Sequence, residues 1–286
     1  MKTILAPLAA LSLLAAQAAP ALAAPVPAAA DWRTPDPENV LVIETNKGTV
    51  FVELSPLAAP AHTERLKTLT RAKFYDGLTF FRVIDGFMDQ TGDPNNQGTG
   101  GSDLPNLEPE FGFRRGAGDP YAFVSKMAPT RDQPSATEVG FVGSLPVRSA
   151  PQMQMMMTAD GKVGAWPLFC GGVAGMARGE APDSANSQFF LMRDLYPSLN
   201  RNYTAFGRVI AGQDAVRSIK IGEPPSDPMD RMLTVRVLAD IPEAQRPKIQ
   251  VMDARSPAFQ ALVAETQKAK GDSFSICDVE IPSKVG

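Results

Sequence analysis

Short runs of apolar and β-branched residues recur along the middle of the chain, and turn-forming residues separate them. Two of these runs, 40–45 and 49–54, flank Asn46-Lys47-Gly48, a sequence typical of a tight hairpin. The same pattern predicts further strands at 78–84, 87–90, 172–177, 188–192, 203–210 and 233–238. Many short strands with few helices favour a mainly β fold, either a barrel or a sandwich with peripheral helices.

Three segments have the spacing or the end signals of helices. Residues 60–71 and 214–220 suit two short helices. Near the C-terminus, Ser256 can cap a third helix that has Pro257 at its first position and ends at Gly271. We expect this third helix to dock on the barrel.

Composition narrows the possible chemistry. The 286 residues carry a formal charge of −3, so the chain lacks the basic surplus that a nucleic-acid partner requires. One histidine, His62, and two cysteines exclude zinc sites built from clustered His and Cys. His62 lies near the start of the helix predicted at 60–71, where we expect it to be exposed or to cap the helix. A hydrolase centred on His62 has little support, because no G-x-S-x-G sequence is present.

The first 23 residues have the features of a secretory signal peptide. Lys2 precedes an apolar run at 4–16, and Ala21-Leu22-Ala23 matches a signal-peptidase site with cleavage near Ala23. The sequence therefore predicts a periplasmic or secreted protein with no membrane segment in its mature form. Residues 24–38 are rich in Pro and Ala, which predicts an extended linker.

The mature chain divides into a domain at 39–240 and a C-terminal extension at 241–286. The domain contains an insertion at about 112–168, which we expect to have some structure of its own, because so long an irregular loop would be unusual. Its methionine-rich run, 153–157, suits either ordinary packing or an adaptable apolar contact surface. Cys170 and Cys277 either form a disulfide or remain two buried thiols.

Four ordered blocks of sequence resemble one known family. The first is 80–93, which reads Phe-Phe-Arg-Val-Ile-Asp-Gly-Phe-Met-Asp-Gln-Thr-Gly-Asp. The others are Gly98-Thr99-Gly100-Gly101, then 175–178 with 186–190, then Leu199 with 206–210. Together they resemble the cyclophilin family of peptidyl-prolyl cis-trans isomerases over roughly residues 40–238 apart from 112–168. The resemblance implies an eight-stranded antiparallel barrel with two capping helices.

The resemblance also implies roles for particular residues. Arg82 matches the catalytic arginine. The walls of the proline pocket are implied to be Phe87, Met88, Phe190 and Leu199. Gln90 and Gln188 match the polar groups that hold Arg82 and the substrate backbone. The edge that pairs with the peptide is implied to be Ala177, Arg178 and Gly179, with Gly98 lining the neighbouring groove and Tyr203 beside the pocket.

The sequence departs from the family pattern at several site positions. Phe81 and Tyr203 stand where histidine is common, and Ser198 stands where tryptophan is frequent. The edge segment reads Ala-Arg-Gly rather than the frequent Ala-Asn-Ala. Loss of the tryptophan weakens the expectation that the chain binds cyclosporin, because in the family that indole contributes a contact. The arginine and the pocket are retained.

The implied reaction suits a chain with one histidine. Rotation about an X–Pro bond is slow because amide resonance gives the bond double-bond character, and it requires no nucleophile, metal or cofactor. A permanently charged donor such as Arg82 can favour the twisted amide over the planar one. We therefore expect a monomeric isomerase, without cofactor, that acts on proline-containing polypeptides. The alternative is a non-enzymatic peptide-binding or chaperone module on the same fold.

Overall fold

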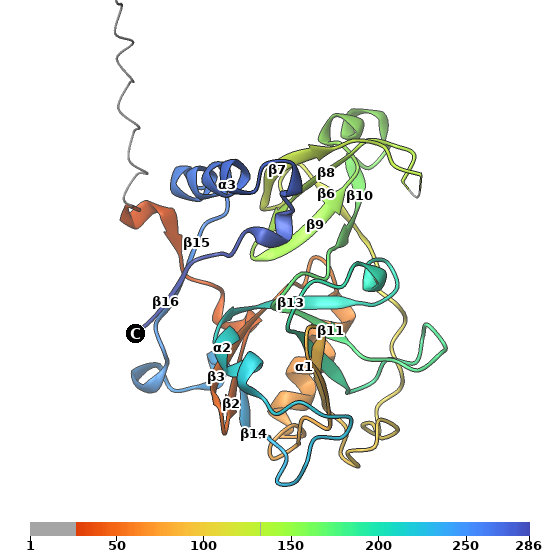
Figure 1. Ribbon diagram of the computed structural model, residues 1–286, viewed down its shortest axis with the longest axis vertical. Helices are drawn as coiled ribbons and strands as arrows, with labels where there is room; N and C mark the ends of the chain where they lie inside the picture. Colours follow the sequence, from red (N-terminus) through yellow and green to blue (C-terminus); the bar gives the residue numbers. More distant parts are fainter. Residues whose placement is uncertain (1–26, 132) are drawn as a thin grey trace, which may run out of the picture.

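Three antiparallel sheets and three α-helices make up residues 27–131 and 133–286, the part of the chain that the computed structural model describes. A curled eight-stranded sheet forms one end of the molecule, and a five-stranded sheet with the last α-helix forms the other (Figure 1). The predicted signal peptide, 1–23, lies outside the described residues. Within the described residues, no helix has both the length and the apolar character needed to cross a bilayer.

The eight-stranded sheet has the strand order β14-β2-β3-β13-β11-β12-β5-β4. Its strands are β2 (Val40–Thr45), β3 (Gly48–Leu54), β4 (Arg82–Ile84), β5 (Met88–Thr91), β11 (Val173–Met176), β12 (Phe189–Met192), β13 (Ala205–Ala211) and β14 (Met232–Val237). Backbone hydrogen bonds between residues 77–80 and 230–232 join its two edges. The prediction of a mainly β, barrel-like fold with an eight-stranded antiparallel sheet is confirmed.

Two helices pack against this sheet: α1 (Pro60–Arg71) against β14 and β13, and α2 (Gln213–Ser218) against β3. Leu66 and Leu69 of α1 and Val216 of α2 enter the core that the sheet encloses. The core also contains large side chains such as Tyr75, Phe80, Phe189 and Phe206. Burial of this apolar surface is what holds the curled sheet and its two helices together.

The expectation that His62 is exposed or caps the helix is wrong, because its side chain is fully buried. Its Nδ1 lies 2.6 Å from Oε2 of Glu110, and that carboxylate also accepts hydrogen bonds from the backbone N–H groups of Ala61 and His62. Glu110 therefore caps the start of α1 from a segment distant in sequence, and it covers the imidazole.

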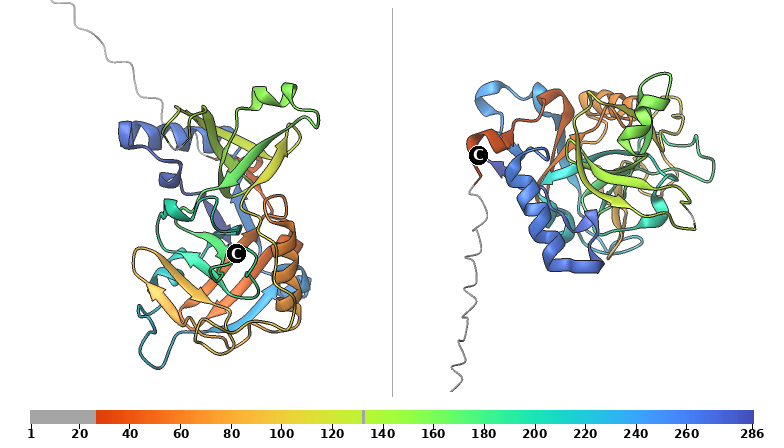
Figure 2. Two further views of the ribbon diagram at one scale, coloured as in Figure 1. Left: turned by 90° about the vertical axis from the view of Figure 1, so that its right-hand side faces the viewer. Right: turned by 90° about the horizontal axis from the view of Figure 1, so that it is seen from above.

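The predicted insertion folds as a sheet of its own, with the order β6-β10-β9-β8-β7. Its strands are β6 (Phe113–Gly116), β7 (Tyr121–Met127), β8 (Thr137–Val142), β9 (Leu145–Ser149) and β10 (Lys162–Pro167). A 3₁₀ helix, Gln152–Met157, connects β9 to β10 and carries the methionine run. The left view of Figure 2 shows this sheet at the end of the molecule away from β2, β3 and β14, and the right view looks down on that end.

The last helix, α3 (Pro257–Lys270), begins at a Ser256 cap and ends at Gly271, as the sequence predicts. It covers the inserted sheet rather than the barrel, so the expected docking site was wrong. The Phe259 ring meets the Phe141 ring of β8 edge-on, with centroids 5.4 Å apart, and both side chains are fully buried. The physical reason is that one face of the inserted sheet is apolar and requires a cover.

Residues 29–39 are not an extended linker, which corrects the prediction for that part of 24–38. They contain β1 (Trp32–Arg33) and two 3₁₀ turns, Ala29–Asp31 and Pro37–Asn39. The third sheet joins β1 to β15 (Ile249–Met252) and β16 (Ser283–Val285) in the order β1-β15-β16. Both ends of the described chain are therefore tied to one small sheet.

Five further 3₁₀ turns complete the described structure: Pro197–Leu199, Leu238–Asp240, Glu243–Gln245, Gly271–Ser273 and Ile276–Asp278. Cys277 in the last of these forms a disulfide with Cys170, whose Cα lies 5.1 Å away. Cys170 follows β10 and precedes β11, so the disulfide ties the C-terminal extension to the junction between the two larger sheets.

Candidate active site

A row of polar side chains crosses three adjacent strands of the curled sheet, β4, β5 and the start of β12. Arg82 on β4 lies directly opposite Gln90 on β5, and Gln90 lies opposite Phe190 on β12. Arg82 Nη1 donates to Gln90 Oε1 at 3.4 Å, and Gln90 Nε2 donates to Gln188 Oε1 at 2.9 Å. Arg82, Gln90 and Gln188 therefore form one hydrogen-bonded row, in which Gln90 contacts Arg82 directly and Gln188 contacts Gln90.

The loop after β5 supports the far end of this row. Gln188 Nε2 donates to the carbonyl oxygen of Gly100 at 2.8 Å. The carboxylate of Asp93 accepts backbone hydrogen bonds from Asn95, Gln97 and Gly98 at 2.5–3.0 Å. Burial alone would raise the pKa of Asp93, but these backbone donors outweigh it and the pKa lies below its usual value. Asp93 thus fixes Gly98 and Gly100 relative to the sheet.

The apolar residues predicted to form the pocket belong to one cluster. Met88, Phe190 and Leu199 are 1%, 4% and 7% exposed, whereas Phe87 and Tyr203 are half-buried at the edge of the cluster. The Phe190 ring lies edge-on to Tyr203 with centroids 6.1 Å apart. The cluster borders the polar row, because Met88 and Gln90 share one face of β5 and Phe190 is paired with Gln90.

Ala177, Arg178 and Gly179 follow the end of β11. The backbone N–H of Ala177 donates to the carbonyl of Gln188 at 2.9 Å. The Arg178 guanidinium lies 4.5 Å from the centre of the Tyr203 ring and donates to the carbonyls of Asn202, Gly179 and Glu180. Arg178 therefore joins the edge segment to the loop that carries Leu199 and Tyr203.

Sequence reasoning missed three residues that contact the predicted site. Glu223 accepts a hydrogen bond from Arg82 Nε at 2.8 Å. Phe169, which follows the inserted sheet, lies beside Phe190 with ring centroids 5.8 Å apart. Tyr196 packs on Phe87 with centroids 4.3 Å apart. No sequence signal identifies them, because each reaches the site from a loop outside the four motif blocks.

The site combines neutral amides and apolar groups with the Arg82 guanidinium, which is paired with Glu223, and with Arg178 at its edge. His62 takes no part in it, since its buried imidazole is paired with Glu110. Across residues 27–131 and 133–286, no group of three or more His, Cys, Asp or Glu side chains is placed to hold a metal ion. Such an arrangement can bind an apolar ring and a peptide backbone and can present a fixed positive charge to them.

Comparison with known proteins identifies the class. The family described as cyclophilin type peptidyl-prolyl cis-trans isomerase matches residues 40–238. A probable peptidyl-prolyl cis-trans isomerase of Brucella suis is 35% identical over 198 residues, which cover 65% of this chain and 74% of that protein. A putative peptidyl-prolyl cis-trans isomerase of Staphylococcus aureus is 30% identical over 207 residues, which cover 71% of this chain and 91% of that protein.

A solved structure extends the likeness beyond the family domain. The crystal structure of cyclophilin AquaCyp293 from Hirschia baltica superposes with a TM-score of 0.79 at 33% identity, covering 89% of this chain and 93% of that chain. This chain therefore belongs to the cyclophilin-type peptidyl-prolyl cis-trans isomerase family. The isomerase class predicted from the four sequence blocks is confirmed.

Proposed function

We propose that this isomerase acts on X–Pro bonds of secreted proteins as they fold, and that Arg82 is its catalytic residue. The observation that carries the proposal is the Arg82–Gln90–Gln188 row beside the cluster of Met88 and Phe190. The apolar cluster supplies a surface for the proline ring, and the amide side chains supply partners for the peptide backbone.

The chemistry requires selective stabilisation of a twisted amide. As the X–Pro bond twists, the nitrogen loses its resonance and its lone pair becomes localised. A guanidinium directed at that nitrogen interacts more strongly with the twisted form than with the planar one, which lowers the barrier. Because the rotation makes and breaks no bond, the reaction needs no proton transfer from the protein.

We place the enzyme in the periplasm or outside the cell, where it acts as a monomer on proline-containing polypeptides without a cofactor. The signal-like sequence at 1–23 supports this location. The disulfide between Cys170 and Cys277 supports it independently, since disulfides persist mainly in oxidising compartments.

The direct test is steady-state isomerisation of an Ala-Pro test peptide by Arg82→Ala. We expect kcat/KM to fall by about 100-fold or more, the usual loss when one preorganised donor to a transition state is removed. Arg231→Ala is the matched control, because Arg231 is an exposed arginine outside the predicted site, at the sheet edge where its backbone pairs with Thr79. A full rate in Arg82→Ala would exclude Arg82 as the catalytic residue.

The exposed methionines of the inserted sheet support a second function. Met153, Met156 and Met157 on the 3₁₀ helix of the inserted sheet are 72%, 86% and 85% exposed, while Met155 is buried. Exposed methionines suit contacts with varied apolar segments, because their unbranched side chains adapt to different shapes. They favour a client-holding role for the insertion, separate from isomerisation.

The variant Met153→Gln/Met156→Gln/Met157→Gln tests this second role. We expect its affinity for a permanently unfolded polypeptide to fall at least about tenfold, since each buried methionine contributes roughly 1.5–3 kcal/mol. Turnover of the Ala-Pro peptide should stay unchanged. Leu233→Gln, which removes an exposed apolar side chain on β14, is the control. Unchanged affinity in the triple variant would contradict the client-holding role.

A further inference from the structure

The loop between α2 and β14 reaches the catalytic strand through one backbone bridge. The Val83 N–H donates to the Gly222 carbonyl at 2.8 Å, and the Gly222 N–H donates to the Val83 carbonyl at 2.9 Å. Because the two segments run antiparallel, the residue after Gly222 lies beside the residue before Val83. The bridge therefore brings Glu223 next to Arg82, although 140 residues separate the two in sequence.

Glycine is required at this bridge. A Cβ built at Gly222 would lie 2.4 Å from the Cα of Pro225 and 2.7 Å from the carbonyl oxygen of Pro224. A side chain at this position would push the loop away from β4. The close approach of the loop to Arg82 is thus a property of the backbone and does not depend on the ion pair alone.

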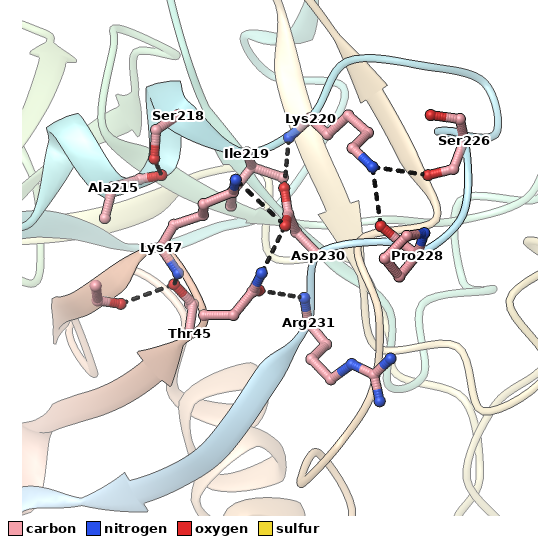
Figure 3. A network of polar contacts seen from close by, with 12 residues as sticks. Thr45, Lys47, Ala215, Ser218, Ile219, Lys220, Ser226, Pro228, Asp230 and Arg231 are labelled. Carbon is pink, nitrogen blue, oxygen red and sulfur yellow. Dashed lines mark hydrogen bonds and ion pairs between the residues drawn. The ribbon is translucent and has the colours of Figure 1, made fainter.

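A polar network fixes the loop at its base (Figure 3). The buried carboxylate of Asp230 accepts hydrogen bonds from Asn46 Nδ2 at 2.6 Å and from the Lys220 backbone N–H at 2.8 Å. Lys220 Nζ donates to the carbonyls of Ser226 and Pro228 at 3.1 and 3.0 Å. Both ends of the loop are therefore held, and Glu223 is presented by a fixed backbone.

Glu223 and Gln90 hold the Arg82 guanidinium at two of its three nitrogens. Oε2 of Glu223 accepts from Nε at 2.8 Å, and Oε1 of Gln90 accepts from Nη1 at 3.4 Å. Within the described residues, Nη2 has no hydrogen-bond partner in the protein. The side chains of Arg82 and Glu223 are 41% and 51% exposed, so the pair faces the solvent where a substrate would bind.

We infer that Glu223 is a positioning residue, which orients the Arg82 guanidinium so that Nη2 faces the substrate amide. This inference rests on the proposed role of Arg82. An arginine side chain has many rotamers in water, and a catalytic donor is effective only when it is already oriented before the substrate twists. The short contact at Nε restricts those rotamers more than the long contact at Nη1.

A contribution to folding stability does not explain the ion pair of Arg82 and Glu223. Exposed ion pairs contribute little to folding, because solvent and salt screen them and ordering two long side chains costs entropy. Removal of the Glu223 carboxylate should therefore change the rate while leaving the melting temperature nearly unchanged. A purely structural role would give the opposite pattern.

The experiment compares Glu223→Gln and Glu223→Ala with the wild type in the Ala-Pro assay. For Glu223→Ala we expect kcat to fall about tenfold, equivalent to 1.36 kcal/mol, with KM within about twofold. Glu223→Gln keeps an acceptor for Nε, so it should retain an intermediate kcat. Asp227→Asn removes an exposed carboxylate from the same loop and should match the wild type.

A spectroscopic readout separates orientation from other effects. In ¹⁵N NMR, the Arg82 Nε–H should exchange slowly with water in the wild type and in Asp227→Asn, and quickly in Glu223→Ala. An unchanged kcat, or an increase in kcat, for Glu223→Ala would overturn the inference while leaving the role of Arg82 intact. If Arg82→Ala itself keeps full activity, the proposed function fails first, and that outcome is distinguishable from failure of Glu223 alone.

Discussion

The curled eight-stranded sheet and the inserted five-stranded sheet bury their apolar faces in different ways. The curled sheet encloses its own core, to which β2, β3, β11, β13 and β14 all contribute side chains. The inserted sheet buries Phe141 under Phe259 of α3, which belongs to the C-terminal extension. In the described part of the chain, the inner core of the curled sheet contains no residue of the C-terminal extension, whereas the inserted sheet depends on that extension for its cover. On its outer face the curled sheet also packs against β15, where Val40 and Phe51 share a cluster with Val251.

The polar residues of the site belong to the curled sheet and not to the inserted sheet. Arg82, Gln90 and Gln188 all lie on the curled sheet or next to its strands. The disulfide and α3 stabilise the inserted sheet, which meets the site at Phe169 beside Phe190. The inserted sheet and α3 also share one apolar cluster with Met88 and Phe190. Changes in the inserted sheet or in α3 should therefore alter the free energy of unfolding more than the rate of catalysis.

Removal of the disulfide should have the largest effect on stability. The bond closes a loop between residues 107 apart, and loss of its constraint on the unfolded chain should lower the free energy of unfolding by about 4 kcal/mol. Cys170→Ala/Cys277→Ala, unfolded in urea, measures the change. The wild type treated with a reducing agent provides the control and should show the same loss.

The same variant tests the separation of the two layers. At temperatures where it remains folded, its kcat/KM on the Ala-Pro peptide should stay within about twofold of the wild type. A folded variant that has lost most of its turnover would contradict the separation. It would mean that the extension controls the site through Cys170 and the adjacent Phe169.

A smaller effect concerns pH and Asp89, which lies between Met88 and Gln90 but is buried on the opposite face of β5. Burial raises its pKa to about 7, and the charge and hydrogen bond of Arg193, 3.0 Å away, oppose the rise only in part. In its folded state Asp89 keeps a proton that the unfolded chain releases above about pH 4. The stability that this group contributes is therefore fully present below about pH 4 and declines as the pH rises towards 7.

The slope of this decline should be at most about 1.4 kcal/mol per pH unit. Urea unfolding of the wild type and Asp89→Asn at pH 5, 6 and 7 measures it, and the difference between the two proteins isolates Asp89 from other carboxylates. Asp89→Asn should lose this part of the pH dependence, whatever its absolute stability. An identical pH dependence in both proteins would show that Asp89 is already ionised in the folded state.

Local sequence patterns predicted the curled sheet well. The strand at 40–45 and the helix at 60–71 were predicted with the bounds that the structure shows, because their apolar periodicity and flanking turns are strong signals. The strand predicted at 78–84 is confined to Arg82–Ile84, because residues 77–80 instead make separate hydrogen bonds that join the edges of the sheet.

Contacts between distant segments could not be predicted from local patterns. The burial of His62 depends on Glu110, and the pairing of β1 with β15 and β16 brings together the two ends of the described chain. The amphipathic pattern of α3 shows that the helix has a buried face, but it does not show which sheet covers that face.

In the candidate site too, local patterns were predictable and contacts between distant segments were not. Strand periodicity and the motif blocks placed Arg82, Gln90 and Gln188 together, because neighbouring strands share one register. Glu223 was missed, because its loop is polar and irregular and reaches Arg82 only through the bridge at Gly222. A residue that acts from such a loop leaves no periodic signal in the sequence.

The central claim is that Arg82 stabilises the twisted amide rather than merely binding the peptide. NMR exchange spectroscopy of an Ala-Pro peptide on the enzyme measures the affinity and the on-enzyme cis–trans rate separately. For Arg82→Ala we predict an on-enzyme rate about 100-fold lower, with peptide affinity within about threefold of the wild type. An unchanged rate, or a loss that lies entirely in affinity, would contradict the account.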